Sequence, residues 1–519
     1  MLERYLNNRF LILYITPLII GSLTSLSFQP YNLIIINFII FPLFFYLVVH
    51  INKKSKAIYR KKPYKKNLFL FGLLFGFGFY LSGIYWITNS LTFDKNFQIL
   101  IPFALIIIPL FLGLFMGFTI LFVGPYLKLN FSSLILFSAS LALSDYLRAK
   151  LFTGFPWNLW AYSTSQANEI LQVLNLIGLY SYNLFVITLF TFPAIIFFKI
   201  KKIEKIFFFT FTFLSILSLY IFGNYEINKN QKILKEKNET IFVKIVSPNF
   251  DLKYGLTKKQ IEERFKKLIR YSDPDKNKKT LFIWPEGVFS GYSYDEIIIF
   301  KKLLSKSFSK KHHIIFGTNR LDTKSGHYYN SMLLIDNNFK IITSYDKRKL
   351  VPFGEFLPFE AVLNKFGFKK ITEGHGSFLK GKNNDNLLID KLNILPLICY
   401  EVIFTDLIQK SNRNTNLIIN ISEDGWFGKS IGPDQHFVKS IFRAIENDTF
   451  FLRSANQGVS AIIDNKGKVI KRLNRNEAGN IELEVPLIKS NKIKNDLIFS
   501  ILLITYLFIF RFYKNNNEK

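Results

Sequence analysis

Long apolar runs separated by shorter polar stretches fill the first 226 residues of the chain. Most of these runs approach the roughly 20 residues that an α-helix needs to cross the hydrocarbon core of a bilayer. The pattern therefore predicts seven membrane helices in this part and one more near the carboxyl end. The predicted helices are residues 10–28, 34–51, 68–88, 99–121, 132–144, 174–198, 206–222 and 498–512, of which the fifth and the eighth are the shortest.

The pattern changes between residues 227 and 494, where charged residues become frequent and short β-type runs alternate with helical stretches. Strands interleaved with helices favour an α/β fold with both sheet faces covered. We therefore predict a membrane domain with seven helices over residues 1–226, one soluble domain over 227–494, and a membrane helix with a tail over 495–519. The predicted strands are residues 241–246, 280–284, 313–317, 331–335, 339–345, 393–399, 416–421, 459–464 and 468–472, and the predicted helices are 258–271, 295–305 and 435–447.

The charge distribution predicts how the chain is oriented in the membrane. It carries 67 Lys and Arg against 37 Asp and Glu, and many of these cations lie in the loops 53–66 and 199–205. Because cytoplasmic loops retain positive charge, we expect both loops and both chain ends in the cytoplasm and the domain 227–494 on the outer side. The first apolar run has no small-residue cleavage site, so we expect it to remain as a helix.

The composition excludes several classes of protein. With 49% hydrophobic residues and a single Cys, the chain is neither disordered nor a disulfide-stapled scaffold. A nucleic-acid or polyanion binder would use the net charge of +30 in its soluble domain, but membrane orientation accounts for the two basic loops. The sequence has no phosphate-binding loop, zinc-type Cys pair or RNA-binding strand motif. We expect no nucleic-acid partner, no metal and no cofactor.

Two features of the membrane half predict packing. Gly72 and Gly76 form a small-xxx-small pattern, which usually marks a close helix contact. The aromatic segment 155–162 is typical of a membrane interface. Arg148 either pairs with Asp145 or binds a phosphate, and the sequence leaves both interpretations open.

The only cysteine, Cys399, ends an apolar strand and precedes Tyr400 and Glu401. An isolated cysteine is most often a small buried core residue. In an oxidising compartment, however, a lone thiol is a hazard unless its reactivity is used. No histidine forms a recognisable pair with Cys399 in the sequence. A carboxylate desolvated in a pocket is therefore the better candidate for the base that takes the thiol proton.

Two further residues follow predicted strands. Glu286 follows 280–284, and Lys347 follows 339–345. Taken singly, Glu286 can be a turn carboxylate and Lys347 one cation of a solvated turn. Together with Cys399 they give the order strand-Glu, strand-Lys, strand-Cys at the carboxyl ends of strands, where α/β sheets build their sites.

These segments resemble a known family. WPEG at 284–287, YDKRKLVPFGEFLP at 345–358 and ICYEV at 398–402 are similar to the signature segments of the nitrilase superfamily, which has a Glu-Lys-Cys triad on an αββα sandwich. The VPFGE segment, the long membrane part and the closing helix resemble the apolipoprotein N-acyltransferase family. Further segments agree with that resemblance over nearly the whole chain, namely SFQPYN, GIYWI, FTGFPWNLWAYS, DGWFGKSIGPDQHF, FRAIE and FLRSANQGVSAIID.

The resemblance implies roles for particular residues. Glu286 would be the general base, Cys399 the nucleophile and Lys347 the cation that stabilises the oxyanion, since a nearby ammonium also lowers a thiol pKa. The residues implied to support the site are Glu355, Glu401 and Tyr400, and those implied to bind substrate are Tyr254, Trp426 and Phe427. Simple pairing with a cation is the alternative for Glu355 and Glu401.

Three positions depart from the family pattern. Glu423 stands where Asn is expected before the Trp-Phe-Gly element, and Tyr254 stands where Trp is common. Lys349 stands where His is frequent, and its charge could favour anionic head groups. None of these departures falls on Glu286, Lys347 or Cys399.

The activity implied by the resemblance is a ping-pong acyl transfer in the bacterial inner membrane. A fatty acyl chain would pass from a phospholipid to Cys399 and then to the α-amino group of the N-terminal diacylglyceryl-cysteine of an apolipoprotein, the final step of lipoprotein maturation. The expected partners are the phospholipid donor, apolipoproteins and the membrane, with the catalytic domain periplasmic and the enzyme monomeric. The alternative is a membrane-tethered nitrilase-type amidase or hydrolase that passes its acyl group to water.

Overall fold

The chain folds into two compact units. A computed structural model describes residues 8–58, 63–236, 239–363, 365, 370, 376–382, 385–409, 414–490 and 495–516. One unit is helical and comprises Met1–Thr88, Gln98–Tyr225 and Ile493–Lys519, and the other is an α/β unit of Asn89–Phe97 and Glu226–Lys492. The segment 89–97 lies between two apolar helices in the sequence but packs with the α/β unit.

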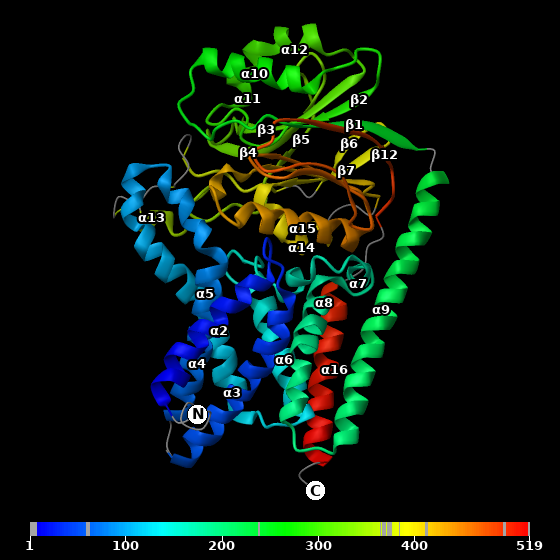
Figure 1. The fold of residues 1–519 in the computed structure, drawn as a ribbon. Helices are drawn as coiled ribbons and strands as arrows, with labels where there is room; N and C mark the ends of the chain where they lie inside the picture. The colour runs from blue at the N-terminus through cyan, green and yellow to red at the C-terminus, as the bar shows by residue number, and fades with distance from the viewer. Residues whose placement is uncertain are drawn as a thin grey trace. The chain divides into compact units, whose positions relative to one another are not determined.

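The helical unit contains long apolar helices (Figure 1). In the described part of the chain, six helical stretches are long and apolar enough to cross a membrane: Ile34–Lys54, Lys65–Thr92, Lys95–Tyr126, Leu174–Phe197, Lys202–Glu236 and Asp496–Tyr513. A shorter apolar stretch, Leu11–Ser27, precedes them. All eight predicted stretches lie in helical segments, but the first lies in this shorter stretch and the fifth in α6 Phe131–Lys150, so neither is among the six that are long and apolar enough to cross a membrane. The α-helices are α2 Thr16–Thr24, α3 Asn37–Ile58, α4 Pro63–Ile84, α5 Ile101–Val123, α6 Phe131–Lys150, α7 Asn168–Leu171, α8 Leu174–Thr191, α9 Lys202–Glu236 and α16 Asn495–Asn516.

Small residues allow α4 and α5 to pack closely, as the small-xxx-small pattern predicts. A Cβ atom placed on Gly72 would lie 2.7 Å from the carbonyl oxygen of Met116, and one on Gly76 would lie 2.8 Å from the Cα of Gly113. A larger side chain at either position would force the helices apart, so the predicted close contact is confirmed.

A buried ion pair decides between the two interpretations of Arg148. Its Nη2 atom lies 2.9 Å from Oδ1 of Asp145, one turn earlier on α6, and both side chains are buried. Arg148 also donates to the carbonyl oxygen of Phe155. The guanidinium therefore pairs with Asp145 and fastens the loop that follows α6.

The α/β unit is built on two six-stranded sheets. Their strand orders are β12-β1-β2-β3-β4-β5 and β11-β10-β9-β8-β7-β6. Strands β1, β2 and β3 are parallel to one another, as are β7, β8 and β9. The strands are β1 Thr240–Ser247, β2 Thr280–Ile283, β3 His312–Leu321, β4 Tyr328–Ile335, β5 Ile341–Asp346, β6 Leu387–Ile389, β7 Leu392–Ile398, β8 Leu417–Glu423, β9 Phe451–Asn456, β10 Ser460–Ile463, β11 Val469–Leu473 and β12 Gly479–Pro486.

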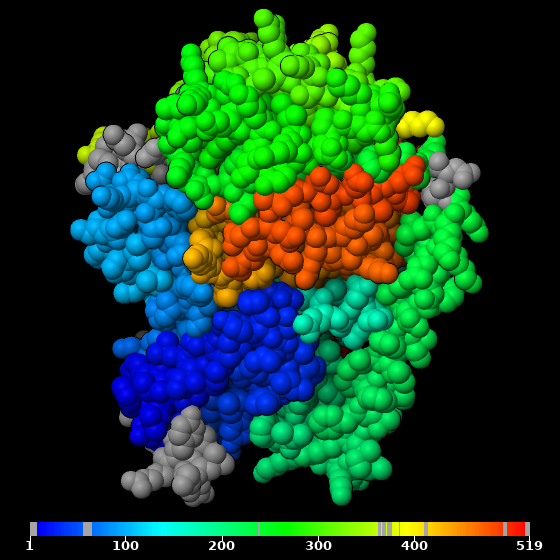
Figure 2. Space-filling model, turned by 45° about the horizontal axis from the view of Figure 1, so that its top comes forward, coloured from blue at the N-terminus to red at the C-terminus, as the bar shows by residue number. Residues whose placement is uncertain are grey.

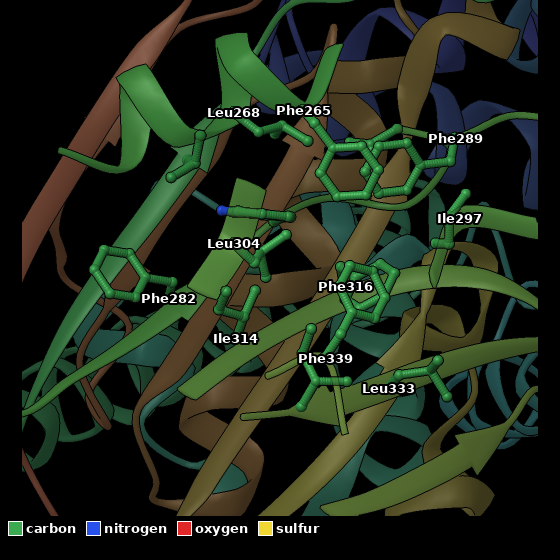
Figure 3. Packing of buried hydrophobic residues seen from close by; sticks show 14 of the residues in the cluster. Phe265, Leu268, Phe282, Phe289, Ile297, Leu304, Ile314, Phe316, Leu333 and Phe339 are labelled. Carbon is green, nitrogen blue, oxygen red and sulfur yellow. The ribbon is translucent and has the colours of Figure 1, made fainter. Parts of the chain in front are cut away.

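Helices cover the outer faces of these sheets. Helix α10, Lys258–Ser272, starts with a capping box between Thr257 and Gln260 and buries Phe265 and Leu268 on one face. Aromatic and aliphatic side chains from this helix and from β2, β3 and β4 form one apolar cluster (Figure 3). Because helices lie outside two stacked sheets, the predicted αββα sandwich is confirmed. The remaining helices are α11 Tyr294–Ile297, α12 Lys301–Ser307, α13 Glu360–Leu363, α14 Thr405–Gln409 and α15 Gly432–Asn447.

Strands β6, β9 and β12 are absent from the predicted pattern. Strand β12 alternates charged and apolar residues, and its ladder with β1 from Thr240↔Pro486 to Ser247↔Gly479 stabilises it. Figure 2 shows the residues of this carboxyl-terminal part, in orange-red, against the green residues that begin the α/β unit. Long-range pairing, rather than local sequence, places these strands in the sheets.

Candidate active site

The ends of three strands hold the three predicted site residues. Glu286 lies three residues after the end of β2, while Lys347 directly follows β5 and Cys399 directly follows β7. The first two strands belong to one sheet and the third to the other. All three side chains are buried, with Lys347 only 1% exposed. The two sheets therefore bring together Glu286 and Cys399, which lie more than a hundred positions apart in the chain.

Lys347 lies between two carboxylates. Its Nζ atom is 2.9 Å from Oε1 of Glu355 and 3.6 Å from Oε1 of Glu286. The side-chain amide of Asn330, on β4, donates to both carboxylates at 2.7 and 2.8 Å. Burial alone would lower the pKa of Lys347, but Glu286 and then Glu355 raise that pKa well above its ordinary value. The lysine is therefore a fixed ammonium ion in a buried site.

Cys399 has an unusual backbone conformation and a protonated thiol. Its φ angle is +49°, which is costly for a residue with a Cβ atom. Burial raises the pKa of the thiol, the nearby Glu286 raises it further, and Lys347 lowers it only in part. The resting thiol thus retains its proton at neutral pH. Nucleophilic attack by a protonated thiol requires a base beside it. Among the nearby carboxylates, Glu286 has the largest electrostatic effect on the pKa of Cys399.

Glu401 ties the segment after Lys347 to the segment around Cys399. Its carboxylate accepts hydrogen bonds from the backbone N–H groups of Arg348 at 2.7 Å, Lys349 at 3.0 Å and Ile398 at 2.9 Å. The hydroxyl of Tyr345 lies within 3.0 Å of both carboxylate oxygens. The partners of Glu401 are thus backbone donors and a hydroxyl rather than Lys347.

The two supporting glutamates therefore differ in their contacts. Glu355 pairs directly with Lys347, which agrees with the alternative interpretation of this residue, simple pairing with a cation. Its other carboxylate oxygen accepts a hydrogen bond from the Val351 N–H at 2.9 Å. Tyr400 is buried and its ring lies edge-on to that of Phe404.

Three aromatic rings lie next to one another, and two of them belong to residues that the family resemblance implies bind substrate. The ring of Tyr254 lies 6.1 Å from Trp426, and Phe93 meets Trp426 edge-on at 5.1 Å. Phe427 is buried, and its carbonyl oxygen accepts from the side-chain amide of Asn89 at 2.7 Å. Asn89 and Phe93 come from the segment 89–97. The sequence gives no sign of this contact, because the segment lies more than 300 residues before Trp426.

Glu423 and Lys349, which depart from the family pattern, both contact other side chains or backbone groups in the structure. Glu423 is buried beside Glu286: its backbone N–H donates to Oε2 of Glu286 at 3.1 Å, while its own carboxylate accepts from Asn456 and Gly425. Burial raises the pKa of Glu423 well above its ordinary value. The ammonium group of Lys349 lies 3.6 Å from a carboxylate oxygen of Asp406.

A buried polar cluster that the sequence does not reveal lies behind Cys399. His436, on α15, contacts the backbone carbonyl of Cys399, and Asp424 and Arg453 contact the histidine ring. The one signal in the sequence is that His436, Asp424 and Arg453 lie in DGWFGKSIGPDQHF and FLRSANQGVSAIID, two of the segments that carry the family resemblance. Within the described ranges, no group of three or more His, Cys, Asp or Glu side chains is arranged to hold a metal ion.

Comparisons with known proteins agree with this architecture. Residues 20–192 match the family model of the apolipoprotein N-acyltransferase N-terminal domain, and residues 252–494 match that of carbon-nitrogen hydrolases. An apolipoprotein N-acyltransferase of Rhodopseudomonas palustris is 30% identical over 91% of this chain and 89% of its own length. One of Rickettsia typhi is 34% identical over 83% of this chain and 85% of its own length. Nit3 of Saccharomyces cerevisiae, a nitrilase-superfamily structure, covers 48% of this chain and 91% of its own chain with 18% identity and a TM-score of 0.37.

The α/β unit has the fold of a carbon-nitrogen hydrolase domain, and the same chain also contains a set of apolar helices. The chain belongs to the apolipoprotein N-acyltransferase family, because relatives at 30% identity and above extend over most of its length. It is therefore an acyltransferase and a multi-pass membrane protein.

Proposed function

We propose that this enzyme transfers a fatty acyl chain from a phospholipid to the α-amino group of the N-terminal diacylglyceryl-cysteine of an apolipoprotein, through a thioester on Cys399. One observation carries the proposal: a carboxylate, an ammonium ion and the only cysteine of the chain meet at strand ends, with Lys347 3.6 Å from Glu286. The named function of the relatives supplies the substrate classes.

In the first half-reaction, the Cys399 sulfur forms a bond to the ester carbonyl carbon while Glu286 takes the thiol proton. The π electrons of the carbonyl move to its oxygen, and the buried Lys347 ammonium stabilises the resulting oxyanion. Collapse of this intermediate breaks the ester C–O bond. The departing lysophospholipid oxygen receives the proton from Glu286, which leaves an acyl-enzyme and a free carboxylate.

In the second half-reaction, the free amine of the lipoprotein attacks the thioester carbonyl. Glu286 takes a proton from the attacking nitrogen, and the C–S bond breaks when the intermediate collapses. The sulfur of Cys399 then receives that proton, so the thiol is restored and the product is an amide. Two half-reactions that share one nucleophile predict ping-pong kinetics.

The contacts at the site support separate roles for the two glutamates next to Lys347. Glu355 forms the shorter ion pair, at 2.9 Å, and its second oxygen is occupied by the Val351 N–H. Glu286 is farther from the ammonium, at 3.6 Å, and has the stronger electrostatic effect on Cys399. Glu355 therefore holds the ammonium in place, while Glu286 is the carboxylate assigned to take the proton of Cys399.

The test is mass spectrometry of the purified full-length protein incubated with phospholipid, with Cys399→Ala as the control. We expect a hydroxylamine-labile acyl mass on Cys399 that moves to the amine of an added diacylglyceryl-cysteine peptide. An acyl mass that decays equally fast without the peptide would instead identify the amidase-type or hydrolase alternative. The absence of any adduct on the native protein would overturn the proposal.

We also propose that the catalytic unit lies in the periplasm of a bacterial cell, that both chain ends are cytoplasmic, and that the enzyme is a monomer. The basic loops support this orientation. In a Cys399→Ala background, a membrane-impermeant maleimide should label Lys259→Cys on exposed α10 in intact spheroplasts, but not Lys202→Cys at the start of α9. The reverse labelling pattern would refute the orientation. Size determination in detergent tests the monomer.

A further inference from the structure

A buried histidine contacts the backbone of the proposed nucleophile residue. The Nε2 atom of His436, on α15, lies 3.3 Å from the backbone carbonyl oxygen of Cys399. The side-chain amide of Asn420, on β8, lies 3.4 Å from the same oxygen. His436 and Asn420 are each 0% exposed, so these contacts are made without competition from water. They hold the carbonyl of a residue whose φ angle is +49°.

The groups around His436 determine which ring nitrogen carries its proton. Burial and then the nearby Arg453 lower the pKa of His436 to about 4, so the ring is neutral at physiological pH. Nη2 of Arg453 lies 3.0 Å from Nδ1, and arginine can only donate hydrogen bonds. Oδ1 of Asp424 also lies 3.0 Å from Nδ1, so the neighbours of Nδ1 alone do not place the ring proton. The carbonyl oxygen of Cys399, 3.3 Å from Nε2, can only accept a hydrogen bond, so a neutral ring that makes this contact carries its proton on Nε2, and Nδ1 accepts from Arg453. The Nε2–H group donates to the carbonyl oxygen of Cys399.

A further ion pair fixes Arg453 in this position. Its Nη2 atom lies 2.8 Å from Oδ2 of Asp424, with both side chains 0% exposed. Asp424 also accepts from the hydroxyl of Ser422 at 2.7 Å. The cluster of Asp424, Arg453 and His436 is thus a rigid support that lies behind the nucleophile.

The orientation of this carbonyl also determines the direction of the next N–H group. The peptide bond between Cys399 and Tyr400 is trans and planar, so its C=O and N–H bonds point in opposite directions. With the carbonyl held by His436, the Tyr400 N–H points away from the histidine. Backbone N–H groups next to a nucleophile can stabilise the oxyanion of an acyl transfer, provided that their direction is fixed beforehand.

We propose that His436 is a positioning residue that holds the Cys399–Tyr400 peptide so that the Tyr400 N–H donates to the oxyanion formed when Cys399 attacks an acyl carbonyl. The inference rests on the proposed function, because it requires an attack by Cys399 on a carbonyl. It does not depend on which acyl donor is used. Lys347 and the Tyr400 N–H would then stabilise the same oxygen.

Two reactions of the same thiol separate this role from general support of the fold. Acylation by 4-nitrophenyl octanoate passes through an oxyanion, whereas alkylation by iodoacetamide is a displacement at an sp³ carbon and does not. The full-length protein is compared with His436→Phe, which removes the donor, and with His436→Gln, which places an amide N–H near the original Nε2 position. Single-turnover rates of both reactions are measured at one pH.

We expect His436→Phe to slow acylation by roughly 10²-fold, the usual effect of losing one oxyanion donor, while alkylation changes only a few-fold. His436→Gln should recover most of the acylation rate. If His436→Phe does not fold, His436→Asn takes its place, because its shorter side chain cannot reach the Cys399 carbonyl. An equal fall in both rates, an unchanged acylation rate, or no recovery with Gln would each overturn the inference.

Comparing the nitrophenyl ester with phospholipid as acyl donors distinguishes failure of this inference from failure of the proposed function. If the native enzyme is acylated by the nitrophenyl ester but not by phospholipid, the proposed donor is wrong, while the comparison of the three His436 side chains still tests the positioning role. If phospholipid acylates the native protein and His436→Phe equally well, the proposed function stands and the positioning role does not.

Discussion

Replacing Glu401 with Gln tests how the two segments of the site are held together. The native carboxylate accepts from three backbone N–H groups, those of Arg348, Lys349 and Ile398, and contacts the Tyr345 hydroxyl. Gln can offer its carbonyl oxygen on the side of Arg348 and Lys349. Its NH₂ group then faces the N–H of Ile398, and that buried donor loses its partner.

The expected destabilisation is about 3 kcal/mol. An unpaired buried N–H costs about 1–3 kcal/mol, and the middle of that range applies because Glu401 is 0% exposed. The remaining bonds lose the negative charge of their acceptor, and hydrogen bonds to a charged group are roughly twice as strong as neutral ones. This weakening adds about 1 kcal/mol.

The assay is urea unfolding of the catalytic unit in the full-length protein, read out by brief proteolysis at each urea concentration. With an m value of about 3 kcal/mol/M, the midpoint should fall by about 1 M. Acylation of Cys399 should also slow by about tenfold, because the backbone next to Lys347 and Cys399 is no longer fixed. The matched control is Glu262→Gln, which removes an ion pair to Lys266 on the surface of α10 and should shift the midpoint little.

A Glu401→Gln protein with the same midpoint as Glu262→Gln would refute this reasoning. It would mean that the Ile398 N–H finds another partner, or that the carboxylate is already protonated and the substitution removes no charge. A lower midpoint with unchanged acylation would show that Glu401 supports the fold without positioning the reacting groups.

Three further predictions follow from the same contacts. Glu286→Gln should slow acylation of Cys399 at pH 7 by roughly 10²–10⁴-fold, because the proposed base is lost, while alkylation at pH 9 persists; equal loss of both would argue against a role as base. The pKa of His436 is lowered to about 4 from 6.5, so the stability it contributes is present above pH 6.5 and is lost as pH falls toward 4. Over that interval the native protein should lose about 3 kcal/mol more unfolding free energy than His436→Gln, and parallel pH curves would contradict this. Phe93→Ala removes the edge-on contact with Trp426, worth about 1 kcal/mol, and should slow acylation by phospholipid but not by a small nitrophenyl ester; equal effects on both donors would exclude a role in lipid binding.

Much of the secondary structure can be predicted from local sequence. All eight apolar runs lie in helical segments of the structure, six of them long and apolar enough to cross a membrane, because a run of about 20 apolar residues has few other stable folds. Helix α10 is predicted at 258–271 and observed at Lys258–Ser272, since its amphipathic pattern and its capping box are both local. In contrast, β9 carries Arg453 and Asn456 at buried positions and does not look like a strand in the sequence.

The candidate site could be predicted only in part. Strand-end positions and the resemblance to a family single out Glu286, Lys347 and Cys399, whose roles stay predictions. Asn330 was missed, although it donates to both Glu286 and Glu355, because an asparagine inside a strand has no distinguishing local pattern. His436 lies in the segment DGWFGKSIGPDQHF, which carries the family resemblance, but nothing in the sequence pairs it with Cys399.

The sequence by itself determined the α/β unit, the apolar helices and the family, and it singled out Glu286, Lys347 and Cys399 as candidates for the chemistry, because hydrophobic periodicity and signature segments are properties of neighbouring positions. Only the tertiary structure decided which charges meet: Glu355 rather than Glu401 pairs with Lys347, and Asp424 and Arg453 hold His436 against the carbonyl of Cys399. It also decided that segment 89–97 packs on Trp426. Contacts between distant residues depend on how the sheets pack, and burial there turns modest electrostatic interactions into strong ones.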